Sequence, residues 1–193
     1  MTPLSLVSSL AALAVVTAPI VQASAAGPAF RISLVQVAPT LRPLVPKIQA
    51  GLPRGMAMRL PRQLEGTTDD GRKFPLYGII QSRNNHDQFT LQLVITPDCE
   101  VRACLVGYIA VASHRFKASP RRGEETESIP LTSGIRGQYV YRSFPNNAAL
   151  PPVHIVVWEQ DGFAYIVSST MKKWKVLEIA KSMATGAVIP SHP

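Results

Sequence analysis

The chain has 193 residues, of which 46% are hydrophobic, 17% charged and 7% aromatic. Its twenty Lys and Arg residues outnumber its twelve Asp and Glu residues, so the formal net charge is +8 at pH 7. This composition excludes a collagen-like chain, an acidic solvating tail and a chain too poor in apolar residues to fold. The length predicts a single folded domain.

The N-terminal segment has the composition of an export signal. Residues 1–30 contain no Asp, Glu, Lys or Arg, and an apolar stretch leads into Ala23-Ser24-Ala25, a pattern that signal peptidase accepts. We predict that residues 1–25 form a signal peptide and that the mature protein is periplasmic or secreted. Retention as a membrane anchor is one alternative, since about 18 apolar residues can just cross a bilayer. Burial as a core helix is the other.

Prolines interrupt the next segment, at positions 39, 43, 46, 53 and 61. Inside a helix proline removes a hydrogen bond and clashes with the preceding turn, so this spacing argues against a helix. We predict that residues 26–62 form a Pro-rich extended lead-in, with a plain linker as the alternative. Residues 63–193 are then the single domain. The lead-in is expected to dock on this domain through its apolar side chains, those of Leu41, Leu44, Val45 and Ile48.

Apolar patterning predicts β-strands in the rest of the chain. In residues 88–96 the side chains of Phe89, Leu91, Leu93 and Ile95 alternate with those of Thr90, Gln92 and Val94, which is typical of a half-buried strand. Residues 104–112 are apolar on both faces of the predicted strand and indicate a central strand. Asp161-Gly162 is a strong hairpin signal between two further runs. The predicted strands are residues 76–82, 88–96, 104–112, 137–143, 153–159 and 163–169. Residues 113–128 are highly charged and are predicted as a solvated loop.

One amphipathic helix is predicted between residue 171 and Gly186, where glycine is expected to end it. Lysines and Glu178 occupy one of its faces. The other face carries apolar side chains at helical spacing, those of Val176, Ile179, Ala180 and Met183. The sequence therefore predicts an α+β fold: an antiparallel sheet of about six strands, with one C-terminal helix packed on it.

Cys99 and Cys104 are the only cysteines. In an exported chain such a pair predicts a disulfide. Free or redox-sensing thiols and a metal site are the alternatives, but redox pairs are usually spaced C-x-x-C, and zinc needs two further ligands. The four histidines, at positions 86, 114, 154 and 192, lack metal-ligand spacing. We predict no metal and no cofactor.

The nucleophile-elbow motif of catalytic serines, G-x-S-x-G, is absent from the sequence. Glu124, Glu125 and Glu127 could supply paired carboxylates, but their charged surroundings favour a solvated cluster. His154 is interpreted as a polar-face residue of a strand rather than a base. No catalytic residue is therefore predicted.

The closing block of the chain reads WEQDGFAY over residues 158–165 and then LEIAKSM in the predicted helix. With this hairpin and helix the segment from Val153 to Ala184 resembles exported bacterial envelope domains of unknown function. Those domains are distantly similar to the lipoprotein-carrier and sigma-regulator families, which have curved antiparallel sheets. The resemblance implies an envelope protein with an α+β fold, with lipid carriage or stress sensing as family functions. It implies no catalytic residue.

Basic residues are the remaining chemical signal. They cluster in residues 54–73 and in the C-terminal helix, and the candidates for anion binding are Arg54, Arg59, Arg62, Lys172, Lys173 and Lys175. Nucleic acid is disfavoured as a partner by the export signal and by the lack of interleaved aromatic residues. We predict an anionic envelope partner, either acidic lipid headgroups or a wall polymer, with peripheral membrane contact. The alternative is that this charge only keeps the surface soluble.

The sequence as a whole indicates a non-enzymatic binding or structural protein of the cell envelope. The alternatives are a carrier that holds an acyl chain or other apolar ligand in a concave sheet, and a small secreted hydrolase with a noncontiguous site. A wide apolar cavity would favour the carrier, and a cleft where Ser or Glu meets His would favour the hydrolase. A filled core with a basic face would favour the binding protein.

Overall fold

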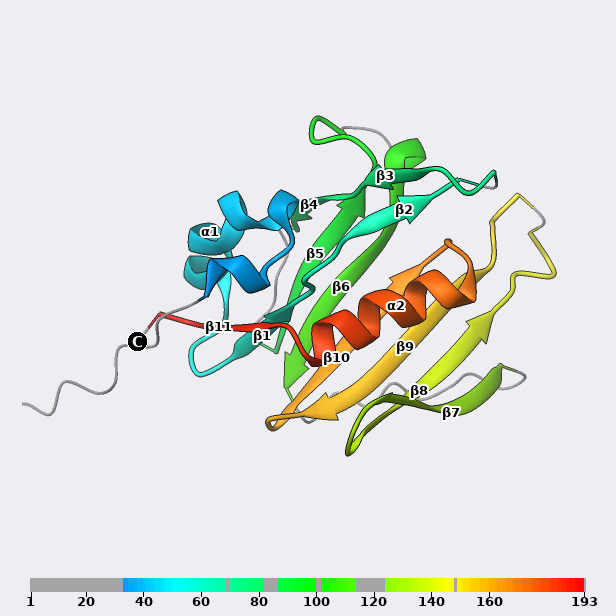
Figure 1. Ribbon diagram of the computed structural model, residues 1–193. Coiled ribbons are helices and arrows are strands. Elements are labelled where there is room, and N and C mark those ends of the chain that lie inside the picture. The colour runs from blue at the N-terminus through cyan, green and yellow to red at the C-terminus, as the bar shows by residue number, and fades with distance from the viewer. Residues whose placement is uncertain are drawn as a thin grey trace, which may run out of the picture. The chain divides into compact units, whose positions relative to one another are not determined.

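A seven-stranded antiparallel sheet dominates the structure, a computed structural model that describes residues 33–68, 70–81, 87–99, 102–113, 124–147 and 149–192 (Figure 1). The predicted signal peptide, residues 1–25, lies outside these ranges. In order across the sheet the strands are β4 (Tyr77–Ile80), β5 (Gln88–Val94), β6 (Leu105–Ser113), β10 (Phe163–Ser169), β9 (Val153–Gln160), β8 (Ile135–Arg142) and β7 (Glu125–Thr132).

The predicted α+β class and antiparallel sheet are confirmed, with seven strands in place of about six. The additional strand is β7, whose first half falls in the predicted solvated loop. That prediction is wrong from Glu125 onward. An edge strand can carry charged side chains and still gain its backbone hydrogen bonds from one neighbour, here β8. Further along β7, Ile129 and Leu131 are buried in the core.

The hairpin between β9 and β10 turns at Asp161 and Gly162, as the sequence predicts. Their φ angles are 54° and 80°, the left-handed pair that a type I′ turn requires. Its register places Trp158 opposite Tyr165, and their rings stack with centroids 5.4 Å apart. The Tyr165 hydroxyl donates to the carbonyl of Ala57 at 3.0 Å, and burial raises the pKa of Tyr165 to about 12.

The proline-rich segment is not extended over residues 39–51. It contains the 3-10 helices η1 (Leu34–Gln36) and η2 (Pro39–Leu44), then α1 (Val45–Gly51). Pro39 and Pro46 stand in the first turns of η2 and α1, where a missing N–H costs no hydrogen bond. The prediction of an extended lead-in is therefore wrong here, although its docking is confirmed. Leu41, Val45 and Ile48 are buried, and Leu44 packs against the same core.

Besides the main sheet, the compact unit that contains the described residues has two pairs of short strands. They are β1 (Ala57–Leu60) paired with β11 (Ala187–Pro190), and β2 (Glu65–Thr67) paired with β3 (Lys73–Pro75). The segment predicted as a lead-in thus provides the partner of the last strand of the chain. No helix in the described ranges is long and apolar enough to cross a membrane.

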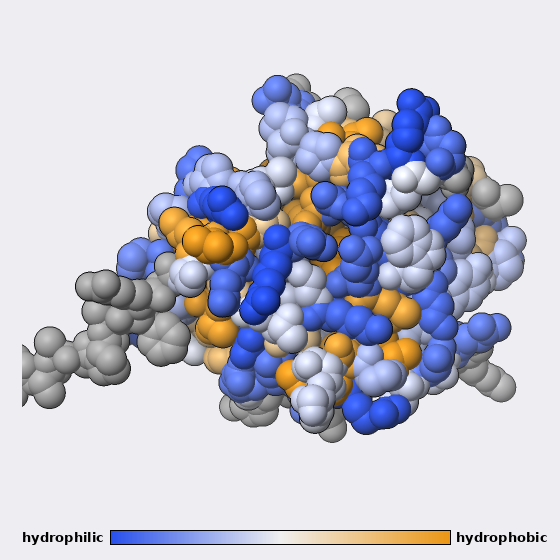
Figure 2. Space-filling view, viewed as in Figure 1, coloured by the Kyte–Doolittle hydropathy of each residue, from blue (hydrophilic) through white to orange (hydrophobic). Residues whose placement is uncertain are grey.

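The helix α2 (Lys173–Ala184) confirms the predicted amphipathic helix and lies across one face of the main sheet (Figure 1). It contacts β9, β10, β7 and β1. Its core-facing side is completely buried and includes the four predicted apolar residues, Val176, Ile179, Ala180 and Met183. Around the helix the same face of the molecule is mostly hydrophilic, with smaller apolar areas between polar side chains (Figure 2).

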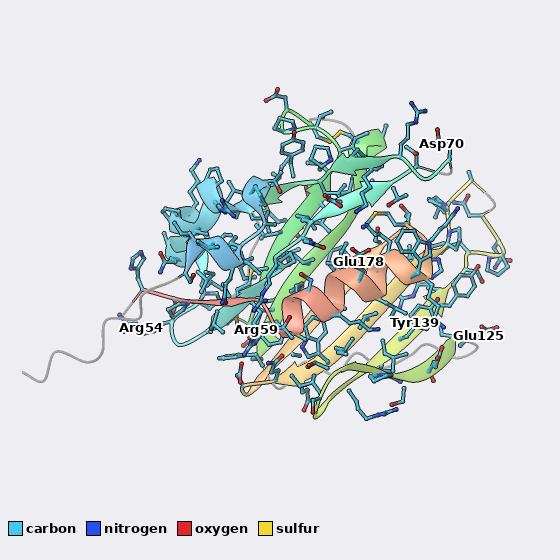
Figure 3. The ribbon with its side chains drawn as sticks, viewed as in Figure 1. Arg54, Arg59, Asp70, Glu125, Tyr139 and Glu178 are labelled. Carbon is cyan, nitrogen blue, oxygen red and sulfur yellow. A yellow bond between two sulfur atoms is a disulfide. The ribbon has the colours of Figure 1, made fainter. Side chains whose placement is uncertain are left out.

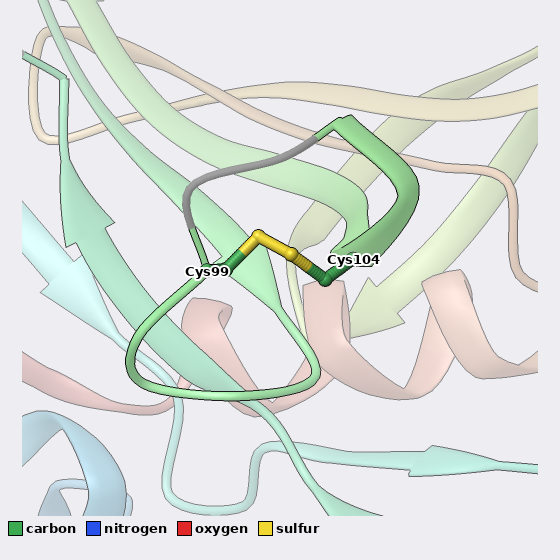
Figure 4. The surroundings of a disulfide bond; sticks show 2 residues. All are labelled: Cys99 and Cys104. Carbon is green, nitrogen blue, oxygen red and sulfur yellow. A yellow bond between two sulfur atoms is a disulfide. The ribbon is translucent and has the colours of Figure 1, made fainter.

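Cys99 and Cys104 form a disulfide where the chain passes from β5 to β6 (Figure 4). Their Cα atoms are 6.0 Å apart, a distance typical of disulfides, so the predicted pairing is confirmed. The bond closes a short loop that ends at Cys104. This cysteine is also the last residue of the 3-10 helix η3 (Arg102–Cys104). On the loop-entropy model so short a loop contributes about 2 kcal/mol of stability.

Candidate functional site

The six basic residues predicted to bind anions do not form one surface. Arg59 and Arg62 bond carbonyls at the C-terminal end of α2, whereas Lys172, Lys173 and Lys175 belong to its N-terminal end. Figure 3 shows Arg59 near one end of the helix and Arg54 farther out on the same side. The helix of twelve residues separates the two groups by about 18 Å.

Arg59 has a structural role. Its guanidinium donates two hydrogen bonds to Asp161 Oδ2, at 2.7 and 3.0 Å, and two longer ones to the carbonyls of Ala184 and Gly186. Only 14% of its side chain is exposed. A cation at a helix C-terminus satisfies the last carbonyls and favours the helix dipole. Arg59 therefore joins β1, the β9–β10 turn and the end of α2.

Two of the lysines are likewise held by carboxylates of the chain. The Lys173 ammonium lies 2.5 Å from Glu127 Oε2 on β7. Lys175 contacts Glu178 at 2.9 Å, and its side chain is only 4% exposed. The prediction that Lys175 contributes to an anion-binding surface is therefore wrong, because its side chain is buried and its ammonium is paired with Glu178. Lys172 and Arg54 remain exposed.

A pocket of about 480 Å³ lies between η2, the segment after β1, and the β2–β3 pair. We call it the basic pocket, because Arg42, Arg62 and Lys73 line it and Glu65 is the one acidic residue among the described residues of its lining. Lys73 pairs with Glu65 at 3.2 Å. The remaining lining is partly apolar and comprises Pro39, Leu64, Phe74 and Pro75, with Thr40 and Gln63 beside them.

Backbone carbonyls orient both guanidinium groups of the basic pocket. Arg42 Nε donates to the Val37 carbonyl at 3.0 Å, and an Nη of Arg62 donates to the Thr185 carbonyl at 3.1 Å. Each guanidinium keeps other N–H groups that can donate to a ligand. The Thr40 hydroxyl is buried and has no hydrogen-bond partner among the described residues. Guanidinium groups held in this way are suited to carboxylate or phosphate oxygens.

A second pocket, of about 460 Å³, lies beside the N-terminal end of α2. We call it the Tyr–His pocket. It is formed on neighbouring strands by register: Tyr141 stands opposite Glu125 on one side and His154 on the other, and Tyr139 stands opposite Glu127. Residues two apart on a strand share a face, so these side chains meet on one side of the sheet. Thr126 and Lys173 complete the lining.

Hydrogen bonding and burial set the protonation of the Tyr–His pocket. The Tyr139 hydroxyl lies 2.7 Å from His154 Nδ1, and the Tyr141 ring contacts the imidazole with centroids 5.3 Å apart. Burial, and then the Lys173 ammonium, lower the pKa of His154. Burial also raises the pKa of Tyr139, and its anionic neighbours add to this. At neutral pH both groups are uncharged, and with its proton on Nε2 His154 accepts from Tyr139.

Acidification is expected to destabilise the protein through His154. The pKa of His154 in the folded protein lies below the ordinary value of 6.5. At a pH between these two pKa values, the unfolded chain therefore binds more protons than the folded chain does. The free energy of unfolding should therefore fall as the pH drops below about 6.5. Urea unfolding at several pH values should show a weaker pH dependence in His154→Gln than in the parent. An unchanged pH slope in this variant would contradict the assignment, and His192→Gln, in an exposed position, is the control.

The sequence signalled these sites only in part. Arg62 was a predicted anion-binding residue, whereas Arg42 lies in the segment interpreted as a lead-in and was not predicted. Nothing in the sequence linked the acidic cluster of Glu125 and Glu127 to His154, and strand register brings the three together. Tyr139 and Tyr141, spaced two apart in a predicted strand, were the signal available for the Tyr–His pocket.

The described ranges contain no group of three or more His, Cys, Asp or Glu residues that could hold a metal ion. No protein-family model, curated protein or solved structure matches the chain. The resemblance of residues 153–184 to envelope domains stays a prediction.

Proposed function

We propose that this chain is an exported, non-enzymatic protein that binds an anionic component of the cell envelope in its basic pocket. One observation carries the proposal. Arg42, Arg62 and Lys73 come from three separate segments and converge on one pocket with a single carboxylate. The carboxylate that pairs with Lys73, that of Glu65, lines this pocket itself, whereas Arg59, Lys173 and Lys175 are held by carboxylates elsewhere in the chain.

The lining of the basic pocket favours an amphiphilic anion. Three cationic side chains against Glu65 leave a net charge of +2 around it, counted from its lining residues. Leu64 is buried beneath these charges, and Phe74 and two prolines add apolar surface beside them. An acidic phospholipid headgroup combines phosphate oxygens with an apolar attachment, and we propose it as the ligand class. Peripheral membrane contact would follow from this binding.

Export is supported by two features. Residues 1–30 carry no charged side chain and end beside a small-x-small cleavage pattern. The pairing of Cys99 with Cys104 fits an oxidising compartment such as the periplasm or the exterior. A mature chain beginning near Ala26 would keep all the charged side chains.

Co-sedimentation with phosphatidylglycerol vesicles tests the proposed function. We expect the mature protein to bind at low salt and to dissociate as salt screens the charges. Arg62→Gln combined with Lys73→Gln should weaken the partition about tenfold or more, because each basic group near an anionic membrane contributes about 1 kcal/mol. Phosphatidylcholine vesicles provide the uncharged comparison.

The matched control for this experiment is Lys47→Gln combined with Lys181→Gln. Both lysines are exposed and neither lines the basic pocket, so this variant loses the same formal charge. Equal weakening in the two double variants would mean that net charge alone drives association. Absence of binding to anionic vesicles at low salt would contradict the proposal itself.

The carrier and hydrolase alternatives have weaker support. Both pockets described above are lined by charged side chains, whereas an acyl carrier needs a wide apolar cavity. A hydrolase would use the Tyr–His pocket, where Glu127 and His154 converge. The described residues that line that pocket include no Ser or Cys, so an enzyme using them would have to activate water directly. We therefore rank it second.

A further inference from the structure

The Tyr–His pocket differs in charge from the rest of the molecule. Two carboxylates, Glu125 and Glu127, face one ammonium, that of Lys173, and His154 is uncharged at neutral pH. The pocket therefore has a net charge of −1 by its lining residues, in a chain whose formal net charge is +8. A cation is the ligand that this local balance favours.

Lys173 shows how an ammonium group is held in this pocket. Its Nζ lies 4.4 Å from the centroid of the Tyr139 ring and 2.5 Å from Glu127 Oε2. The aromatic face supplies a cation–π contact and the carboxylate supplies the opposite charge. Glu127 and Tyr139 are directly opposite each other on β7 and β8, so register creates the pair.

A second pair of Glu and Tyr lies two residues away on the same strands, β7 and β8. Glu125 stands opposite Tyr141, and the side chains point to the same face as Glu127 and Tyr139 because the strand period is two. Glu125 is exposed and makes no ion pair with any described residue. Tyr139 and Glu125 are both labelled in Figure 3, at the end of α2 opposite to Arg59.

We propose that Glu125 and Tyr141 bind the ammonium group of a small primary amine, in the way that Glu127 and Tyr139 hold Lys173. His154 forms one wall beside Tyr141, with which its imidazole is in ring contact. The pocket volume of about 460 Å³ accommodates a short alkyl chain attached to the ammonium. A primary amine is favoured over a quaternary one, because a carboxylate can accept its N–H groups.

This site is separate from the basic pocket and goes beyond the proposed function. Lys173 is the first residue of α2, and Arg62 contacts Thr185 just beyond the other end. The intervening helix is about 18 Å long, too far for one small molecule to bridge. Failure of amine binding would leave the vesicle result unaffected, and failure of vesicle binding would leave this site unaffected.

Titration with n-butylammonium chloride, followed by NMR chemical shifts at constant ionic strength, tests the proposal. We expect saturable shifts at β7 and β8 in the millimolar range, with potassium chloride producing none of them. Glu125→Gln should weaken the affinity about fivefold to tenfold, since it removes the free carboxylate. Glu159→Gln is the matched control, because this exposed carboxylate lies on the opposite face of β9 from His154.

A gain-of-binding variant makes the test sharper. Lys173→Met should strengthen butylammonium binding, because it removes the competing ammonium and releases the Glu127–Tyr139 pair. Tetramethylammonium, which cannot donate hydrogen bonds, should bind more weakly than butylammonium. The proposal is overturned if Glu125→Gln and Glu159→Gln have equal affinities, if Lys173→Met abolishes binding, or if butylammonium produces no saturable shifts in the parent protein.

Discussion

A chain that ends at Thr170 is expected to lose cooperative unfolding altogether. It lacks α2 and β11, and with them the completely buried side chains of Val176, Ile179 and Met183. Burying each such side chain stabilises the fold by about 1.5–3 kcal/mol, and a whole domain is stable by only about 5–15 kcal/mol. The truncated chain also leaves β1 without its strand partner. Thermal unfolding followed by circular dichroism measures the effect.

A single substitution tests the same packing without removing a strand. Ile179→Ala should lower the free energy of unfolding by about 2–5 kcal/mol, the range for deleting a buried aliphatic side chain. Lys181→Ala, two residues along on the exposed side of α2, should change it by less than about 0.5 kcal/mol. Similar losses in the two variants, or a cooperative melt of the truncated chain near that of the parent, would show that α2 is peripheral.

Gly186→Ala is expected to destabilise the protein by about 3 kcal/mol or more. A Cβ at this position would lie 1.9 Å from the carbonyl oxygen of Leu60, and also 2.9 Å from that of Ser182. Both obstacles are backbone atoms, so they cannot turn away as a flexible side chain does. The chain between α2 and β11 would have to move away from β1, which it contacts directly.

Gly134→Ala is the matched control for this substitution. Gly134 has a φ of 79°, and a Cβ there would meet nothing within 4 Å. Its cost should be only the backbone strain of a left-handed alanine, about 1–2 kcal/mol. Urea unfolding of both variants compares them. If Gly186→Ala were the milder of the two, the close approach of this segment to β1 would be incorrect.

The proposals assign different ligands to the two ends of one helix. At its C-terminal end α2 presents carbonyls that hold Arg59 and Arg62, and Arg62 also lines the basic pocket. At its N-terminal end Lys173 extends toward the carboxylates of β7. Substitutions that shift α2 are therefore expected to affect both pockets, whereas those at Glu125 or Lys73 should affect only one.

Local patterns in the sequence were sufficient for much of the sheet and for the C-terminal helix. Alternating apolar residues in 88–96, the Asp161-Gly162 turn and the helical spacing of Val176 to Met183 each depend on neighbours within a few residues. The cysteine pair also closes a short loop. The structure agrees on Phe89, Leu91 and Leu93 and on the apolar face of α2. The periodicity failed at Ile95, which lies beyond β5 and is exposed, and at Val94 and Lys175, which are buried.

The sequence alone was insufficient for elements that owe their structure to distant partners. β1 pairs with β11, more than a hundred residues away, and neither four-residue strand has a strong pattern of its own. β7 is a charged edge strand that its neighbour β8 stabilises. Residues 39–51 are helical because Pro39 and Pro46 fall in first turns, because the 3-10 helix η2 contains Pro43, and because their apolar side chains pack in the core.

The candidate sites depend on tertiary structure for the same reason. The sequence alone showed that basic residues are in excess and that the N-terminal segment carries no charged side chain. Which cations remain available is a property of three-dimensional pairing: Lys175 is buried against Glu178, and Arg59 is held by Asp161. Arg42 joins Lys73 only because η2 packs beside the β2–β3 pair. Charge is additive along a sequence, but an electrostatic site depends on distances that only the folded chain sets.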